Sequence, residues 1–116
     1  MTLGRLIDQL TDMPQDEPIY FDFGRLRPGG LMSYRGLYER LALGFDGENE
    51  VKVSDLLAEC RTAIGKTFTG YKGGDYVMDR DTLVHVANYG NTSETQIVRI
   101  SRGRFCVLIE TAHVDD

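Results

Sequence analysis

Apolar and polar residues alternate along this chain with two different periods. From Leu3 to about Asp12, apolar residues recur every three or four positions, which is typical of a helix with one apolar face. Thr2 is suited to cap this helix and Pro14 to end it. A second helix is predicted from its N-cap Ser54 to Gly65, a residue that favours the left-handed turn at a helix end. Its buried stripe consists of Leu56, Leu57, Cys60 and Ile64.

Most other segments alternate with a period of two, as β-strands do. Turn-forming residues separate them, and short connections favour antiparallel neighbours. The predicted strands are Ile19–Phe23, Met32–Phe45, Asp75–Met78, Thr82–Tyr89, Thr95–Ser101 and Arg104–Ala112. We therefore predict a single α+β domain over residues 1–116, with the order α-β-β-α-β-β-β-β and two helices packed on a mainly antiparallel sheet.

The long predicted strand Met32–Phe45 places charged residues on its apolar face. Arg35 and Glu39 share the parity of Leu41 and its apolar neighbours, so a regular strand would turn both charges toward the apolar side. Such a charge needs a partner or a position at the rim of a pocket. A bulge at Gly36 would instead turn Arg35 outward, so the sequence leaves both interpretations open.

Composition excludes several classes of protein. A net charge of −5 disfavours binding to duplex nucleic acid, which requires a basic surface. The absence of a long apolar run and of a signal-peptide pattern predicts a protein of the cytoplasm with no membrane partner. Cys60 and Cys106 lie among apolar residues and are expected to be free thiols, and the spacing of cysteines and histidines predicts no metal site. No cofactor is predicted.

Catalytic motifs are weak or incomplete. Gly65-Lys66-Thr67 resembles the end of a phosphate-binding loop, but Cys60 stands where that motif requires glycine and a helix precedes it. His85 lies within a predicted strand and is expected to be packed or hydrogen-bonded there. The sequence therefore predicts a protein that is not an enzyme.

Two segments combine glycine with basic and aromatic residues, at positions 23–44 and 66–76. Arginine can grip a phosphate with two bonds, tyrosine can stack on a base, and glycine lets backbone amides approach an anion. The candidate ligand-binding residues are Arg35 as the main phosphate clamp, Tyr34, Arg27, Tyr38, Lys66, Tyr71, Lys72 and Gly73. The alternative is that these are solvated turn residues.

The strings FDFG, PGGL, SYRG, LALG, GKTFTGYKGG and VANYGN resemble a family of small accessory proteins from bacteriophage and prophage genomes. They extend over roughly residues 21–91. The resemblance implies a phage protein made in the cytoplasm of a bacterial host. By analogy with phage proteins of this size, it implies an inhibitor of host defence, which can act by sequestering a nucleotide signal. It carries over no activity and no residue roles.

These observations favour a non-catalytic binder of a small anionic, nucleotide-like ligand, assembled as a homo-oligomer. An inhibitor that binds a host protein through its acidic surface or a sheet edge is the first alternative. A small enzyme that degrades a nucleotide signal is the second.

Overall fold

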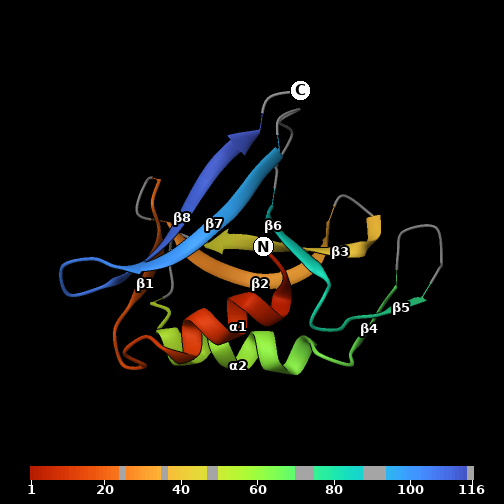
Figure 1. Cartoon of the computed structure of the whole chain (residues 1–116), viewed down its shortest axis with the longest axis horizontal. Coiled ribbons are helices and arrows are strands. Elements are labelled where there is room, and N and C mark those ends of the chain that lie inside the picture. Colours follow the sequence, from red (N-terminus) through yellow and green to blue (C-terminus); the bar gives the residue numbers. More distant parts are fainter. Residues whose placement is uncertain (24–25, 35–36, 47–49, 70–74, 88–93, 115–116) are drawn as a thin grey trace.

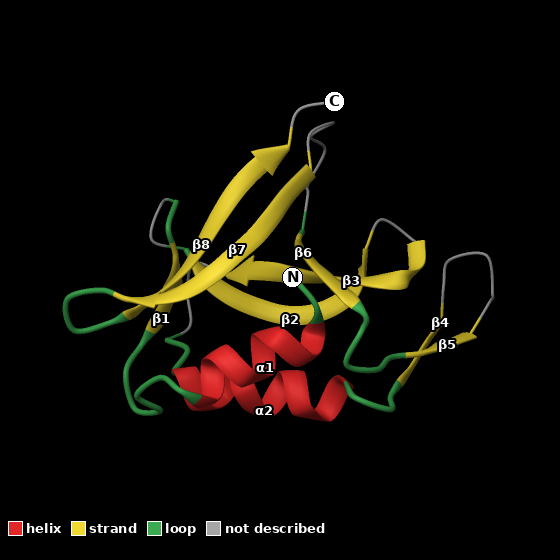
Figure 2. Cartoon of the chain, in the orientation of Figure 1, coloured by secondary structure: helices red, strands yellow, loops and turns green. Residues whose placement is uncertain are grey.

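The computed structural model describes residues 1–23, 26–34, 37–46, 50–69, 75–87 and 94–114. Its elements are α1 (Leu3–Thr11), β1 (Ile19–Phe21), β2 (Arg27–Tyr34), β3 (Leu37–Asp46), α2 (Val53–Ala63), β4 (Thr67–Thr69), β5 (Asp75–Val77), β6 (Leu83–Val86), β7 (Glu94–Arg102) and β8 (Val107–Val114). Both helices lie side by side against a strongly curved sheet (Figures 1 and 2). The predicted α+β class with two helices is confirmed.

Helix α1 forms where its apolar stripe and its cap predict. The Thr2 Oγ1 accepts a hydrogen bond from the Arg5 amide at 3.2 Å, which satisfies a donor that a helix start leaves without an intrahelical partner. The Gln9 side chain of α1 accepts a hydrogen bond from the Ile100 amide of β7 at 2.8 Å. The fully buried residues of the stripe are Leu3, Leu6 and Leu10. Apolar packing and a polar contact therefore both hold α1 in place.

Helix α2 differs from its prediction at both ends. It begins at Val53, one residue before the predicted cap Ser54, and the Asp55 carboxylate accepts a hydrogen bond from the Lys52 amide at 2.9 Å. Gly65 adopts the predicted left-handed conformation, with φ of 78°. Ile64 was expected in the core but is 37% exposed, because the helix has already ended.

The main sheet is mixed rather than mainly antiparallel. Its strand order is β1-β8-β7-β6-β3-β2, with β1 parallel to β8 and β3 parallel to β6, while β4 and β5 pair separately. Only the run β6-β7-β8 is the predicted antiparallel meander. The prediction missed the parallel pairs because they join strands that are far apart in the sequence, which periodicity does not reveal.

The predicted strand Met32–Phe45 is in fact two antiparallel strands. Met32 of β2 pairs with Ala42 of β3, and β2 begins at Arg27, five residues before the start of the predicted strand. The parity argument for Arg35 therefore does not apply, since the two halves of the segment belong to different strands. Residues 35–36 lie outside the described residues, so the predicted alternatives for Arg35, an inward side chain or a bulge at Gly36, stay predictions.

The sheet curls until its two edge strands approach each other. The Phe21 amide of β1 donates a hydrogen bond to the Leu26 carbonyl, just before β2, at 2.8 Å, and the Ile19 amide donates to the Val51 carbonyl at 3.0 Å. The Phe21 ring is 5.1 Å from the Phe23 ring and 6.3 Å from the Phe45 ring of β3, centroid to centroid. The result is a nearly barrel-like sheet whose β1 edge is bonded by the chain itself.

Gly4 of α1 lies against Arg80 of the turn before β6. The Arg80 Nη2 donates to the Gly4 carbonyl at 3.2 Å and to the Asp8 carboxylate at 2.8 Å. A Cβ atom at position 4 would lie 2.8 Å from Arg80 Nε and 2.9 Å from Arg80 Cβ. Position 4 therefore requires glycine, although it lies within helix α1.

We expect Gly4→Ala to lower the free energy of unfolding by about 1–2 kcal/mol, because the added methyl group displaces Arg80. Alanine is ordinarily better than glycine in a helix by about 1 kcal/mol, so the expected sign is the reverse of the usual one. Urea denaturation measures the change. In an Arg80→Gly background the same substitution should be neutral or stabilising. Stabilisation by Gly4→Ala alone would contradict the close contact.

Candidate functional site

A pocket lies along the pair β1 and β8 and reaches the tip of the β7–β8 hairpin. Its volume is about 700 Å³, within the range of small-molecule sites. We call it the β1–β8 groove. Its lining consists of Pro18, Tyr20, Phe21, Asp22, Arg27, Gly103, Arg104, Phe105, Cys106 and Leu108.

Alternation along two strands forms the floor of the groove. Ile19 and Phe21 of β1 are buried in the core, so Tyr20 between them faces the other side of the sheet. Tyr20 pairs in register with Leu108 of β8, and both line the groove. The floor therefore joins an aromatic ring to an aliphatic side chain.

Arg27 reaches the groove because the sheet curls. The Arg27 Cζ lies 5.8 Å from the centroid of the Tyr20 ring, within the range of a cation–π contact. A guanidinium stacked on a ring keeps its N–H groups in its own plane, where they can donate to an anion. Arg27 and Tyr20 together can thus bind a phosphate and a flat ring.

Asp22 adds a carboxylate at the end of β1. Its Oδ2 accepts a hydrogen bond from the Thr111 amide at 2.9 Å, and its Oδ1 accepts one from the Thr111 hydroxyl at 2.6 Å. These bonds fix the carboxylate against β8. Each carboxylate oxygen has a further acceptor site, so Asp22 can also accept a hydrogen bond from a sugar hydroxyl.

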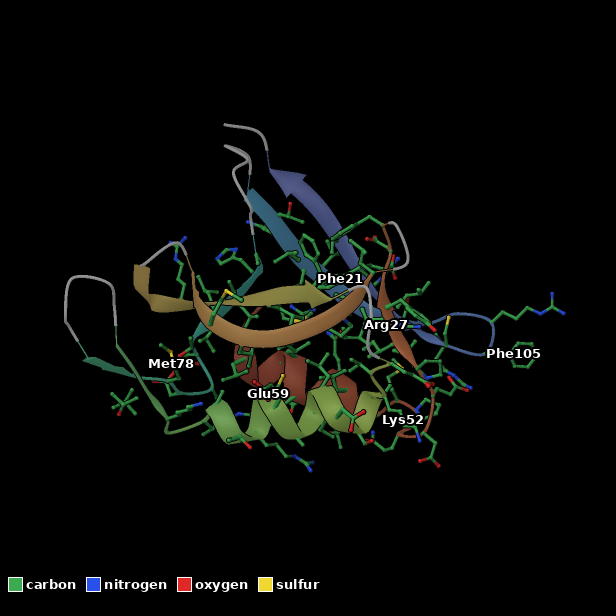
Figure 3. All side chains as sticks on the ribbon, turned by 180° about the vertical axis from the view of Figure 1, so that it is seen from behind. Phe21, Arg27, Lys52, Glu59, Met78 and Phe105 are labelled. Atoms are coloured by element: carbon green, nitrogen blue, oxygen red, sulfur yellow. The ribbon has the colours of Figure 1, made fainter. Side chains whose placement is uncertain are left out.

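The hairpin tip holds an aromatic residue in an unfavourable backbone conformation. The Gly103 amide donates to the Cys106 carbonyl at 2.8 Å, and between them Phe105 has φ of 63°. Phe105 is 81% exposed and points away from the body of the molecule (Figure 3). The Arg104 Cζ lies 5.8 Å from the Phe105 ring centroid. A bulky residue in the left-handed region is an outlier, and such outliers cluster at functional sites.

We expect Phe105→Gly to raise the free energy of unfolding by about 0.5–1 kcal/mol, because glycine adopts a positive φ without steric strain. Thermal and urea denaturation measure the change. Phe105→Ala is the matched control, since it removes the ring but keeps a Cβ atom, and it should bring no gain. A Phe105→Gly protein no more stable than Phe105→Ala would contradict the strain.

The two cysteines should differ in reactivity. Burial raises the pKa of the Cys60 thiol from 9.0 to about 12, with the charge of Glu59 adding to the effect, whereas Cys106 is only half-buried in the groove. We expect a thiol reagent at pH 8 to modify only Cys106 in the folded protein and both cysteines in denaturant. Equal rates for the two thiols in the folded protein would contradict the burial of Cys60.

The raised pKa of Cys60 also predicts how stability depends on pH. Between pH 9.0 and about pH 12 only the unfolded chain ionises this thiol, so the free energy of unfolding should fall as the pH rises through that range.

Of the predicted site residues, the structure describes the side chains of Arg27 and Lys66, and only Arg27 of these two lines the groove. Arg27 lies in the groove, whereas Lys66 lies exposed between α2 and β4, at the opposite end of the molecule in Figure 1. Tyr34 is the last residue of β2, at the opposite end of that strand from Arg27. Tyr38 belongs to β3, and the side chains of Tyr34 and Tyr38 lie outside the description. The remaining candidates, Arg35, Tyr71, Lys72 and Gly73, lie outside the described residues.

Gly29 and Gly30 line a different, smaller pocket of about 230 Å³ between β2 and α2. Asp55 and Glu59 line it too, and the Leu31 amide donates to Glu59 Oε1 at 3.4 Å. Two carboxylates disfavour an anion there. This pair of glycines is therefore unsuited to the anion-binding role that the sequence suggested.

Sequence reasoning did not identify Tyr20, Asp22, Arg104 or Phe105 as site residues. Tyr20 and Asp22 alternate with apolar residues, and this alternation predicts a strand but not a binding site. Arg104 and Phe105 were assigned to a strand that in fact begins at Val107. The available signal was an arginine and an aromatic residue directly after Arg102-Gly103, where a hairpin turn was expected.

No protein-family model matches the chain, and no curated protein or solved structure matches it. Within the described ranges, no cluster of three or more metal-ligating side chains occurs. Neither α1 nor α2 has the length and apolar character needed to cross a membrane. Function is therefore argued from the chemistry of the groove.

Proposed function

We propose that this protein is a non-catalytic binding protein that holds a small anionic, nucleotide-like ligand in the β1–β8 groove. The observation that carries the proposal is the cation–π contact of Arg27 with Tyr20, at 5.8 Å from Cζ to the ring centroid, in the lining of a pocket of about 700 Å³. An aromatic face and a cation held together are the two groups that a base and its phosphate require.

Each part of a nucleotide has a candidate partner in the groove. Arg27 donates to a phosphate, the Tyr20 ring stacks on a base, and Asp22 accepts from a sugar hydroxyl. The Leu108 side chain adds apolar contact on the floor.

The proposed biological setting comes from the resemblance to small phage proteins. Sequestering a nucleotide signal in a bacterial host would counteract a defence pathway that depends on that signal. Assembly as a symmetric homo-oligomer is part of this proposal, because a symmetric assembly repeats one site on each subunit. Sedimentation of the purified protein tests this assembly.

Isothermal titration calorimetry of the purified protein tests the proposal. The ligands are nucleoside monophosphates, cyclic di- and trinucleotides, and ADP-ribose derivatives. We expect saturable heat with at least one of them, and the absence of heat at ligand concentrations well above micromolar would refute the proposal. Chromatography of the ligand after long incubation should return it chemically unchanged. A converted ligand would favour the enzyme that degrades a nucleotide signal.

The alternative, an inhibitor that binds a host protein, draws on one observation. Phe105 presents an 81% exposed ring at a hairpin tip, and exposed aromatic residues serve as anchors in protein interfaces. The tip suits this role better than the β1 edge, where the Ile19 and Phe21 amides are already bonded within the chain. Retention of one stoichiometric host protein, lost with Phe105→Ala but kept with Arg27→Gln, would favour this alternative.

A further inference from the structure

The β1–β8 groove contains a second arginine–aromatic pair besides Arg27 and Tyr20. At the hairpin tip, the Arg104 guanidinium lies 5.8 Å from the Phe105 ring centroid, the same separation as in the first pair. All four residues line one pocket. The groove thus offers a ring and a guanidinium at two separate places.

The second pair is held outward against a local backbone preference. Phe105 has φ of 63° and is 81% exposed, so its ring gains little packing within the chain in return for the strain. Strain of this kind persists where the residue serves a purpose other than stability. A ring held free in solvent beside a guanidinium is ready to stack on a base.

The register of β1 and β8 sets the spacing between the pairs. Tyr20 is opposite Leu108, and Leu108 is three residues from Phe105. Phe105 lies in the hairpin tip before β8 begins at Val107, so the two rings occupy different positions along the lining of the groove. A mononucleotide has one base and can occupy one pair, whereas a ligand that occupies both pairs needs two bases joined by a linker.

We propose that the groove takes a dinucleotide, with one base–phosphate unit at each arginine–aromatic pair. This inference rests on the proposed function and names the ligand class within it. Base stacking on an aromatic side chain strengthens binding by about tenfold or more per base, so the second pair should add a factor of that size. Linear and cyclic dinucleotides share this chemistry, and the experiment separates them.

Calorimetry compares three sets of ligands on the full chain. The first is the four nucleoside 5′-diphosphates, which carry one base and the charge of two phosphate groups. The second is the four linear homodinucleotides with a 5′-phosphate, and the third is cyclic diadenylate and cyclic diguanylate. We expect at least one dinucleotide, linear or cyclic, to bind about tenfold more tightly than the diphosphate with the same base.

The variant Phe105→Leu removes the ring but keeps an apolar side chain. It should reduce the ratio of dinucleotide to diphosphate affinity to near one. Arg61→Gln is the control, because Arg61 is exposed in the last turn of α2 and does not line the groove, and it should leave the ratio unchanged.

The outcomes separate this inference from the proposed function. Diphosphates that bind as tightly as every dinucleotide would overturn the dinucleotide inference and leave the groove as a mononucleotide site. A ratio that survives Phe105→Leu would also overturn it. No binding of any of these ligands would overturn the proposed function itself for nucleotides of this size.

Discussion

Replacing Phe21 with alanine is expected to lower the free energy of unfolding by about 3–5 kcal/mol, the range for large-to-small changes of a buried aromatic residue. Phe21 is 1% exposed, and its ring packs against Phe23 at 5.1 Å and Phe45 at 6.3 Å. These contacts join β1 to β3 across the curled sheet. Alanine would leave a cavity where the two edges of the sheet approach each other. Urea denaturation followed by circular dichroism measures the loss.

Phe105→Ala is the matched control for Phe21→Ala, because it makes the same chemical change at an exposed position. It should alter the free energy of unfolding by less than about 0.5 kcal/mol. A loss below about 1 kcal/mol for Phe21→Ala would contradict the central position of this ring in the core.

Replacing Arg27 with glutamine is expected to weaken binding of the nucleotide ligand by about 10- to 100-fold, since hydrogen bonds to charged groups contribute roughly 1.5–3 kcal/mol. The substitution removes both the charge and the cation–π contact with Tyr20. Calorimetry measures the affinity, and thermal denaturation verifies that the variant is folded.

Arg27→Lys separates the charge of this residue from its shape. Lysine keeps a positive charge but has no planar fork, so it should recover only part of the affinity. Arg61→Gln makes the same charge change as Arg27→Gln, far from the groove, and should bind within about twofold of the unaltered protein. Full affinity in Arg27→Gln would place the ligand elsewhere on the molecule.

Local signals were sufficient to predict both helices. The apolar stripe and the Thr2 cap predicted α1 to within one residue of its end, and Gly65 has the predicted positive φ. Each of these signals depends on residues within a few positions of one another, so a sequence displays it directly. Sheet order does not have this property, because the parallel partners Ile19 and Val107 are far apart in the chain.

The candidate site was predicted only in part. Arg27 was chosen from the concentration of arginine and glycine around it, and the structure places it in the groove. Lys66, chosen on the same evidence, lies elsewhere, because the two basic segments were assumed to converge and the fold separates these two residues. Tyr20 gave no signal beyond the alternation of its strand, and its importance comes from a contact with Arg27 that only the curl of the sheet creates.

The sequence by itself determined the α+β class, the two helices and most strand segments, since these follow from periodicity, capping and turn residues. The tertiary structure alone decided that β1 lies beside β8, that the sheet curls until β1 meets the start of β2, and that Arg27 lies over the Tyr20 ring. It also decided that Phe105 stands outward at a hairpin tip with φ of 63°. The physical reason is that register, curvature and long-range pairing depend on how all the apolar faces pack together, which no local stretch of sequence specifies.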